Sequence, residues 1–377
     1  MVHVSSVRMG CLLLIVPSLL ATGQTQDSSD LDKLLRAGAT AEQQGDFAAA
    51  VNSYRKALEV QPNSLPARKG LGAALAAEGQ LDEAIEEDKR VLALSPDDTV
   101  VRVNVAVAYF KKGDLPHARA ELEVLHSANP VDSAVAVLLA NTYVKMGREA
   151  EAIELLTPLE PGHENDMQFE YSLAFAQIQS GHETEGLPRM ENVARATGFA
   201  SAWIIAGASR LNRSEFAEAQ TDLDAAIRLN PSLPGLYTMA GQVQYALGDS
   251  ESAHRMFQAA LRADPNDTTA NLYTGMYWLD RGDIESARPL LALTLQLRPT
   301  FPLARLKMAQ LNSMTGDYAE AVKTLEDLEK ASPDWPEPHI QLALLYYKVR
   351  RPEDGQRERA IVQQIQARQQ KEGPPKN

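Results

Sequence analysis

The chain has 377 residues, of which 44% are hydrophobic and 23% are charged, a balance that excludes disorder along the whole length. Aromatic residues make up only 6%, and alanine, leucine, glutamate and glutamine are abundant, which favours helices over strands. The formal net charge of -13 disfavours binding to nucleic acid or to anionic membrane surfaces, because both are negatively charged.

The first 23 residues are typical of a cleavable signal peptide. Arg8 lies in a short polar start, an apolar run extends from residue 11 to residue 21, and Ala21 and Gly23 are spaced as a signal peptidase requires. The run is short for a membrane span. We therefore expect an exported protein, periplasmic or secreted, with residues 24–30 as a linker. An uncleaved N-terminal anchor and a buried core helix are the alternatives.

From about residue 31 onward, glycine and proline each recur with a period of 34 residues. The glycines form two groups, Gly45, Gly79, Gly113, Gly147 and Gly181, followed by Gly248, Gly282 and Gly316. The prolines also form two groups, Pro62, Pro96 and Pro130, followed by Pro231, Pro265, Pro299 and Pro333. Both series slip by one residue in the same place, which indicates a single-residue deletion between Gly181 and Ser214.

Each recurring glycine predicts a turn between two helices. Glycine ends a helix in the left-handed conformation without steric cost, and aspartate often follows it, as in Gly45-Asp46, where it can cap the next helix. The recurring proline comes 17 residues after the glycine and cannot continue the second helix. Two helices of about a dozen residues each, with two tight turns, account for the period.

Small residues mark the positions where the two helices of one repeat touch. Alanine stands five residues after most of the glycines. A larger apolar residue, such as Phe257 or Leu291, stands nine residues after the glycine. A glycine or alanine, such as Gly275, stands seven residues before the turn. Small residues let the two backbones approach, and the large residue fills the space that remains.

This combination resembles the tetratricopeptide repeat family, which has small residues at repeat positions 8 and 20, a large residue at position 24 and proline at position 32. The resemblance covers residues 31–350 and implies an all-α fold, a right-handed α-solenoid of tandem helix-turn-helix repeats. The ten units are residues 31–64, 65–98, 99–132, 133–166, 167–199, 200–233, 234–267, 268–301, 302–335 and a last one from residue 336.

Two neighbouring units depart from this pattern. Repeat 167–199 has Gly186 in place of alanine and Pro188 inside its second helix, so we expect that helix to be short, kinked or loosened. The preceding repeat has Glu164 in place of the recurring proline. We predict a degenerate joint at residues 158–200, which is either a hinge or the decay of one unit.

The end of the chain is predicted to close the array. Residues 351–370 are expected to form a capping helix, because apolar residues lie on one stripe of an otherwise polar segment. The stripe consists of Ala360, Ile361, Val362 and Ile365. Residues 371–377 are expected to be a disordered tail.

The sequence carries no motif that predicts catalysis, so no catalytic residue, cofactor or metal ligand is expected. Gly70-Leu71-Gly72 lacks the Lys-Ser or Lys-Thr of a phosphate loop. His163 and His182 each precede a glutamate but lack the second histidine of a zinc-binding helix.

Two clusters that suggest chemistry have a simpler structural interpretation. The acidic run Asp82, Glu83, Glu86, Glu87 and Asp88 is expected to be a solvated helix face. Tyr273, Tyr277 and Trp278 suggest an aromatic cage, but Trp278 falls at a core position of its repeat, so packing is the expectation.

The remaining indication of function is the surface formed by the first helices of the repeats. The resemblance implies a concave groove that binds extended or helical peptides and is lined by positions 2, 5, 9, 12 and 13 of each unit. The residues at these positions include Lys69, Phe110, Lys111, Asn141, Lys145, Phe175, Gln179, Asn212, Gln242, Tyr245, Met276, Gln310, Tyr347 and Lys348. These residues either bind a partner or merely solvate the inner wall.

The function expected from the sequence is a non-catalytic scaffold or adaptor in the cell envelope, with a protein partner bound in the groove as a peptide or helix. We expect no nucleic-acid partner and no integral membrane span after signal cleavage. The alternative is an accessory subunit of an envelope enzyme, or of a system that makes or exports polysaccharide.

Overall fold

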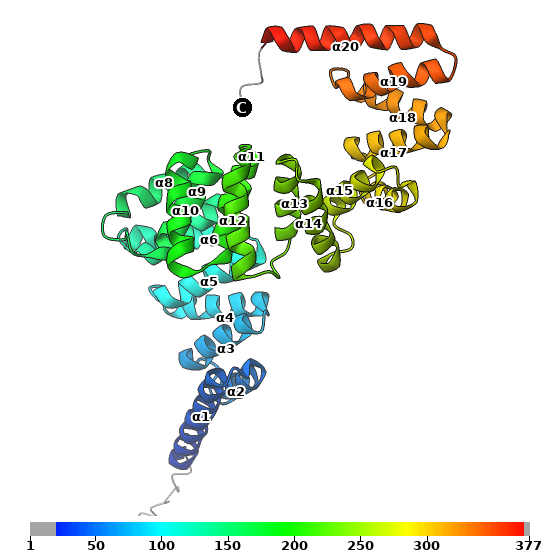
Figure 1. The fold of residues 1–377 in the computed structure, drawn as a ribbon. Coiled ribbons are helices and arrows are strands. Elements are labelled where there is room, and N and C mark those ends of the chain that lie inside the picture. Colours follow the sequence, from blue (N-terminus) through cyan, green and yellow to red (C-terminus); the bar gives the residue numbers. More distant parts are fainter. Residues whose placement is uncertain (1–19, 373–377) are drawn as a thin grey trace, which may run out of the picture. The chain divides into compact units, whose positions relative to one another are not determined.

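The computed structural model describes residues 20–372, and within them every regular element is a helix (Figure 1). The predicted all-α solenoid of tandem repeats is confirmed. The described chain divides into two units, one ending at His182 and the other beginning at Glu183. None of the described helices is both long and apolar enough to cross a membrane.

The first unit holds the helices of the first four repeats and the first helix of the fifth. In chain order these are α1 (Leu20–Gln43), α2 (Phe47–Val60), α3 (Leu65–Ala77), α4 (Leu81–Leu94), α5 (Thr99–Lys112), α6 (Leu115–Ala128), α7 (Ser133–Lys145), α8 (Glu149–Leu156), the short 3-10 helix η1 (Thr157–Leu159) and α9 (Met167–Gln179).

The second unit begins with the second helix of the fifth repeat and continues through the last. Its helices are α10 (Glu183–Thr197), α11 (Ala200–Asn212), α12 (Phe216–Leu229), α13 (Leu236–Ala246), α14 (Ser250–Ala263), α15 (Thr268–Asp280), α16 (Ile284–Leu297), α17 (Pro302–Thr315), α18 (Tyr318–Ala331), α19 (Pro336–Lys348) and α20 (Pro352–Glu372).

The turns inside the repeats have the left-handed backbone that the glycine series predicts. All eight recurring glycines have positive φ, as at Gly282, where φ is 75°. Two repeats lack the glycine and still adopt this conformation, with φ of 62° at Ser214 and 61° at Arg350. Residues with a Cβ pay a steric penalty in this region, so these two turns are held by the packing of the helices on either side.

The structure locates the single-residue deletion in the turn between α10 and α11. Only Gly198 and Phe199 separate these helices, whereas residues 61–64 separate α2 from α3. Because α10 has 15 residues and α2 has 14, the net difference is one residue. Gly198 has a φ of 66°, which makes the shorter turn possible.

The prediction that Pro188 shortens its helix is wrong, because α10 has 15 residues, whereas a kink or loosening at Pro188 stays a prediction. Helix α10 continues through Pro188, just as α16 continues through Pro289, which has the same place in its repeat. Both prolines are exposed, so the backbone carbonyl that each leaves without a helical partner can bond to water. The short second helix belongs instead to the preceding repeat, where α8 has 8 residues and is followed by η1.

Two terminal predictions need correction where the residues are described. Residues 24–30, predicted as a linker, are helical and continuous with α1. Helix α20 extends to Glu372, so the first two residues of the predicted disordered tail are helical. Most of the predicted signal peptide and residues 373–377 lie outside the described residues.

Helix α20 takes the place of the second helix of the tenth repeat, so it is not a separate cap added after the array. It follows the left-handed turn at Arg350 and packs on α19 through Gly355. A Cβ at Gly355 would lie 2.8 Å from a ring carbon of Tyr347. Its buried face includes Glu358 and Ile365, whereas Ala360, expected on the apolar stripe, is exposed.

The acidic run of α4 is not the fully solvated face that was predicted. Asp88 is 1% exposed and takes the place of the large apolar residue at position 24 of its repeat. Its Oδ1 atom has no hydrogen-bond partner among the described residues. Burial, followed by the nearby charges of Glu87 and Asp98, raises the pKa of Asp88 to about 7.

Candidate functional site

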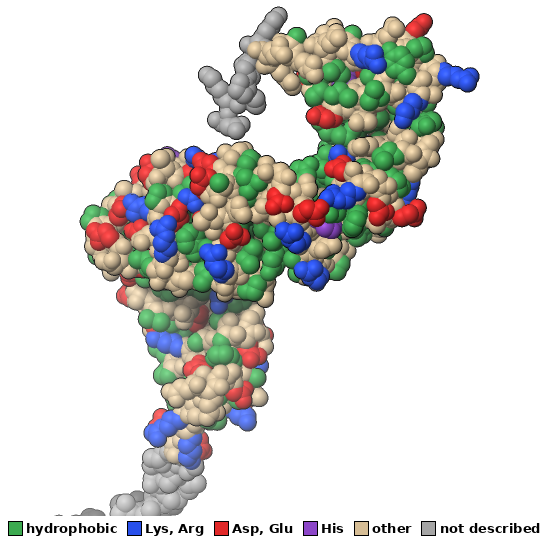
Figure 2. Space-filling view, viewed as in Figure 1, with side chains coloured by type: hydrophobic (Ala, Val, Ile, Leu, Met, Phe, Trp, Pro, Cys, Tyr) green, Lys and Arg blue, Asp and Glu red, His purple; other side chains and the backbone are tan. Residues whose placement is uncertain are grey.

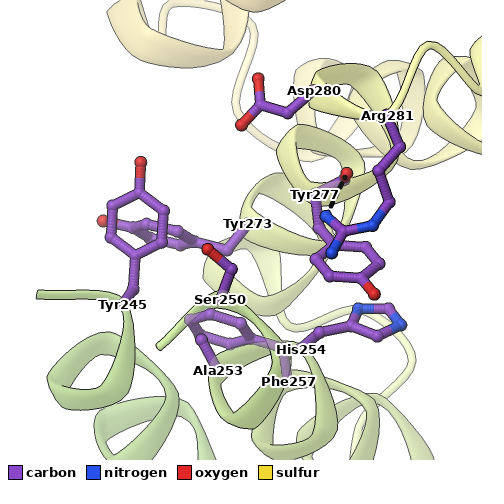
Figure 3. Close-up of a pocket in the computed structure, with 9 residues that line it drawn as sticks. All are labelled: Tyr245, Ser250, Ala253, His254, Phe257, Tyr273, Tyr277, Asp280 and Arg281. Atoms are coloured by element: carbon purple, nitrogen blue, oxygen red, sulfur yellow. Dashed lines mark hydrogen bonds between the residues drawn. The ribbon is translucent and has the colours of Figure 1, made fainter. Parts of the chain in front are cut away.

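The most concentrated group of aromatic side chains in the second unit lies on α13, α14 and α15 (Figure 3). The rings of Phe257 and Tyr273 are stacked with centroids 4.9 Å apart. Tyr245 meets Tyr273 edge-on at 4.8 Å. His254 stacks on Tyr277 at 3.8 Å. Offset and edge-on aromatic contacts of this kind add stability beyond the area they bury.

The repeat pattern explains why these rings meet. Phe257 is the large residue at position 24, and Gly241 on α13 faces it, so closely that a Cβ there would lie 2.6 Å from the ring. Asp249 caps α14 by accepting a hydrogen bond from the backbone N–H of Ser252 at 2.9 Å. Asp267 caps α15 by accepting one from Ala270, also at 2.9 Å.

A charged group borders the aromatic rings on one side. The Tyr277 hydroxyl donates to the Glu251 carboxylate at 3.0 Å, and Arg281 forms an ion pair with the same carboxylate. The Arg281 guanidinium also lies over the Tyr277 ring, 3.6 Å from its centroid. The hydrogen bond from Tyr277, together with the Arg281 charge, lowers the pKa of Glu251 and keeps it ionised.

His254 is the buried polar group of this cluster. Burial lowers its pKa, so the imidazole is neutral at neutral pH. The Gln258 amide nitrogen lies 2.9 Å from Nε2, whereas Nδ1 has no hydrogen-bond partner among the described residues. Burial also raises the pKa of Tyr273.

The cavity among these residues is small. Its volume is about 30 Å³, which is room for one or two water molecules rather than for a substrate or cofactor. Tyr245 is 43% exposed and presents its ring on the outside of the cluster. The arrangement is therefore suited to surface recognition, with Tyr245 as a ring held in place by Tyr273.

The structure leaves most of the predicted groove residues accessible. Met276 is the exception: it is 4% exposed and packs in the core with Leu311 of α17, so its assignment to the groove is wrong. Partly buried are Phe110, Asn141, Phe175, Gln242 and Gln310. Exposed are Lys69, Lys111, Lys145, Gln179, Asn212, Tyr245, Tyr347 and Lys348. Whether these residues bind a partner stays a prediction.

Few of the predicted groove residues touch one another. In the first unit, the Lys145 ammonium lies 4.1 Å from the centroid of the Phe110 ring, and Lys69 pairs with Asp98. In the second unit, Tyr245 contacts Tyr273, which was not among the predicted groove residues. The contacts of Phe110 with Lys145 and of Tyr245 with Tyr273 hold side chains from successive repeats in fixed relative positions.

Sequence reasoning missed the contribution of the second helix of the repeat to this cluster. His254 and Phe257 come from α14, while the groove prediction drew only on first helices. Tyr273 and Tyr277 were recognised as a possible cage, but their partners are these α14 rings and Tyr245. Trp278 packs against the neighbouring core, as expected. Pairing position 24 with the next first helix would have identified the contact between Phe257 and Tyr273.

One further group of polar side chains could hold a metal ion. Atoms of Glu329, His339 and Glu358 lie within 4.8 Å of one another. His339 Nδ1 is 2.7 Å from Glu358, and its Nε2 is 2.9 Å from the carbonyl oxygen of Pro333. Because both ring nitrogens have protein partners, the arrangement serves to hold α20 against α19.

Comparison with known proteins identifies the family. Two tetratricopeptide repeat profiles match the chain, one at residues 35–99 and 238–302 and the other at residues 77–141 and 279–357. The matches lie within the repeat region described above and together span more than half of the chain. The chain belongs to the tetratricopeptide repeat family. None of the curated proteins matches it.

Solved structures agree with this fold. The chain is similar to a tetratricopeptide repeat protein from Parabacteroides merdae, with 16% identity, a TM-score of 0.55, and coverage of 66% of this chain and 99% of that chain. Yeast Tom70 matches over 92% of this chain and 97% of that chain at 14% identity, but its TM-score of 0.36 is too low to support a shared fold. Tetratricopeptide repeats indicate a protein–protein interaction scaffold, a class that is generally non-catalytic.

Proposed function

We propose that this protein is a non-catalytic scaffold of the cell envelope that binds a partner protein through the exposed faces of its first helices. The observation that carries the proposal is the ring of Tyr245, which is exposed to solvent yet held against Tyr273. An aromatic side chain that is already ordered loses little conformational entropy on binding, which is why such residues dominate protein interfaces.

Phe110 supports the same interpretation in the first unit. Its ring lies beneath the Lys145 ammonium, so an aromatic surface and a cation are presented together. Both residues come from first helices of consecutive repeats, α5 and α7. The envelope location rests on the N-terminal sequence, where an apolar run follows Arg8 and precedes Ala21 and Gly23.

Affinity capture tests the proposal. Immobilised protein beginning at Gln24 is exposed to envelope extract from the native cells, and retained proteins are identified by mass spectrometry. A second bait carries Phe110→Ala and Tyr245→Ala. A matched control carries Val124→Ala and Leu229→Ala, which remove exposed apolar side chains from second helices. We expect one protein to be enriched on the unmodified and control baits and lost from the aromatic variant.

Retention of only glycan, or of nothing specific, contradicts the scaffold proposal and favours the accessory subunit of an envelope enzyme or polysaccharide system. The envelope location is tested separately by fractionation of the native cells and N-terminal sequencing of the protein. A chain recovered from the cytoplasm with Met1 intact contradicts export.

A further inference from the structure

Repeat 268–301 buries one face of its helix pair under the first helix of the next repeat. In repeat 268–301, Leu272 and Leu291 are fully buried, and with Met276 they form one core cluster with Ala304 and Leu311 of α17. Within the repeat, Leu272 is at position 5, Met276 at position 9 and Leu291 at position 24. Stacking of this kind makes each repeat depend on its neighbour to cover its apolar face.

In the last described repeat, formed by α19 and α20, no helix of the described residues covers the same face. Ile340 at position 5 is 39% exposed, and Leu344 at position 9 is 55% exposed. Between α19 and α20 lies a pocket of about 270 Å³. It is lined by Ile340, Ala343, Leu344, Arg359, Val362 and Gln363. Figure 2 shows hydrophobic side chains at the surface of this part of the chain.

The geometry of the repeat indicates which kind of segment covers this face. In repeat 268–301 the covering element is a helix, α17, which packs apolar side chains against positions 5, 9 and 24. The pocket on the last repeat is shaped by the same positions of the same helix pair. An amphipathic helix laid across α19 and α20 would repeat the packing that α17 makes with α15 and α16.

The charge that lines the pocket indicates that the polar face of the covering helix is acidic. Arg359 is the only charged residue that lines the pocket, at position 24, where inner repeats mostly have a large apolar residue. Its guanidinium lies 4.7 Å from the centroid of the Tyr347 ring. Arg359 pairs with no carboxylate of the described residues, so its charge is available to an acidic partner.

We propose that the open face of α19 and α20 is a docking site for an amphipathic helix of a partner protein whose polar face is acidic. The helix packs on α19 and α20 as α17 packs on α15 and α16, with its apolar residues on Ile340 and Leu344 and its carboxylates near Arg359. This inference rests on the proposed scaffold function and adds a partner class to it.

The test uses the full chain and three synthetic peptides, each about 18 residues long so that a helix can form. All three carry leucine at the i, i+3, i+4 and i+7 spacing; their polar faces are glutamate, glutamine or lysine. Binding is measured by fluorescence anisotropy. We expect the acidic peptide to bind at least tenfold more tightly than the lysine peptide, with an affinity that falls as salt is added.

Two variants test whether the acidic peptide binds at the open face of α19 and α20. Leu344→Glu places a carboxylate on the apolar face, and we expect it to weaken binding of the acidic peptide at least tenfold. Arg359→Glu is expected to reverse the preference toward the lysine peptide. Leu297→Glu on α16, where the leucine is similarly exposed, is the matched control and should leave binding unchanged. Circular dichroism melting confirms that each variant is folded.

The proposal is overturned if no peptide binds, if the lysine or glutamine peptide binds best, or if Leu344→Glu and the control behave alike. Sedimentation that shows self-association abolished by Leu344→Glu also overturns it, because the occupant is then a second copy of the chain. The envelope capture depends on Phe110 and Tyr245, so it can succeed when the peptides fail, and the two proposals are judged separately.

Discussion

Repeats 65–98 and 268–301 have the same helix-turn-helix arrangement, and they differ in the buried side chain at position 24. Each has glycine at position 8 of its first helix, Gly72 in one and Gly275 in the other, and each glycine leaves room for the residue at position 24. In repeat 268–301 that residue is Leu291, packed in an apolar cluster. In repeat 65–98 it is Asp88, equally buried but with one carboxylate oxygen unpartnered.

The difference shows that a repeat can stack with a carboxyl group at a core position, provided that the carboxyl group stays protonated. The folded-state pKa of Asp88 is about 7, above the unfolded value of about 3.9. A raised acid pKa stabilises the fold below the unfolded pKa, and that stability is lost as pH rises toward the folded pKa. The loss between pH 4 and pH 7 is about 4 kcal/mol at most.

The largest expected effect comes from placing an aspartate at position 24 of repeat 268–301, where the surrounding cluster is apolar. Leu291→Asp removes a fully buried side chain and introduces a charge without a partner, so we expect it to cost about 4–5 kcal/mol at pH 8. Hydrogen exchange measured on peptides of α15 and α16 reports this locally, which suits an array whose repeats need not unfold together. Unchanged protection there contradicts the account of position 24.

The converse substitution is expected to stabilise. Asp88→Leu should raise the free energy of unfolding of α3 and α4 by about 3 kcal/mol at pH 8 and by much less at pH 4. At the lower pH the Asp88 carboxyl is protonated in the folded state and about half protonated in the unfolded state, so little of the cost of burying its charge remains. Gly72 leaves room for the leucine, as Gly275 does for Leu291.

The control for this prediction is Asp88→Asn, which keeps the shape and removes the charge. It should abolish the pH dependence of hydrogen exchange in α3 and α4. A dependence that persists in the variant assigns the titration to another group, with the neighbouring Asp98 as the first candidate.

The smallest expected effect concerns a feature that both repeats share, the left-handed glycine of the turn. Gly282→Ala meets no atom within 4 Å, so its cost is confined to the backbone and should be about 1 kcal/mol. Ser214→Gly, where the turn already lacks glycine, should stabilise by about 0.5–1 kcal/mol. Thermal melting compares the two; effects of equal sign would contradict this interpretation of the turn.

The periodic sequence predicted the fold because each repeat contains its own turn and contact signals. The glycine and proline series indicated where helices end, and the shared one-residue slip indicated the deletion that the structure shows between α10 and α11. The site was predicted less well. Met276 was assigned to the groove from its position alone, but it packs against Leu311 of the following repeat. Position within a repeat does not report how closely the next repeat approaches.

Local sequence determined the helices, their turns and the family, because 34-residue periodicity, glycine backbone freedom and proline geometry act within a single repeat. Tertiary structure alone decided which equivalent residues are buried. Leu272 and Ile340 have the same position and similar chemistry, yet one is covered by α17 and the other, in the last described repeat, is exposed. Burial depends on the presence of a neighbouring helix, and that is a property of the stack rather than of the residue.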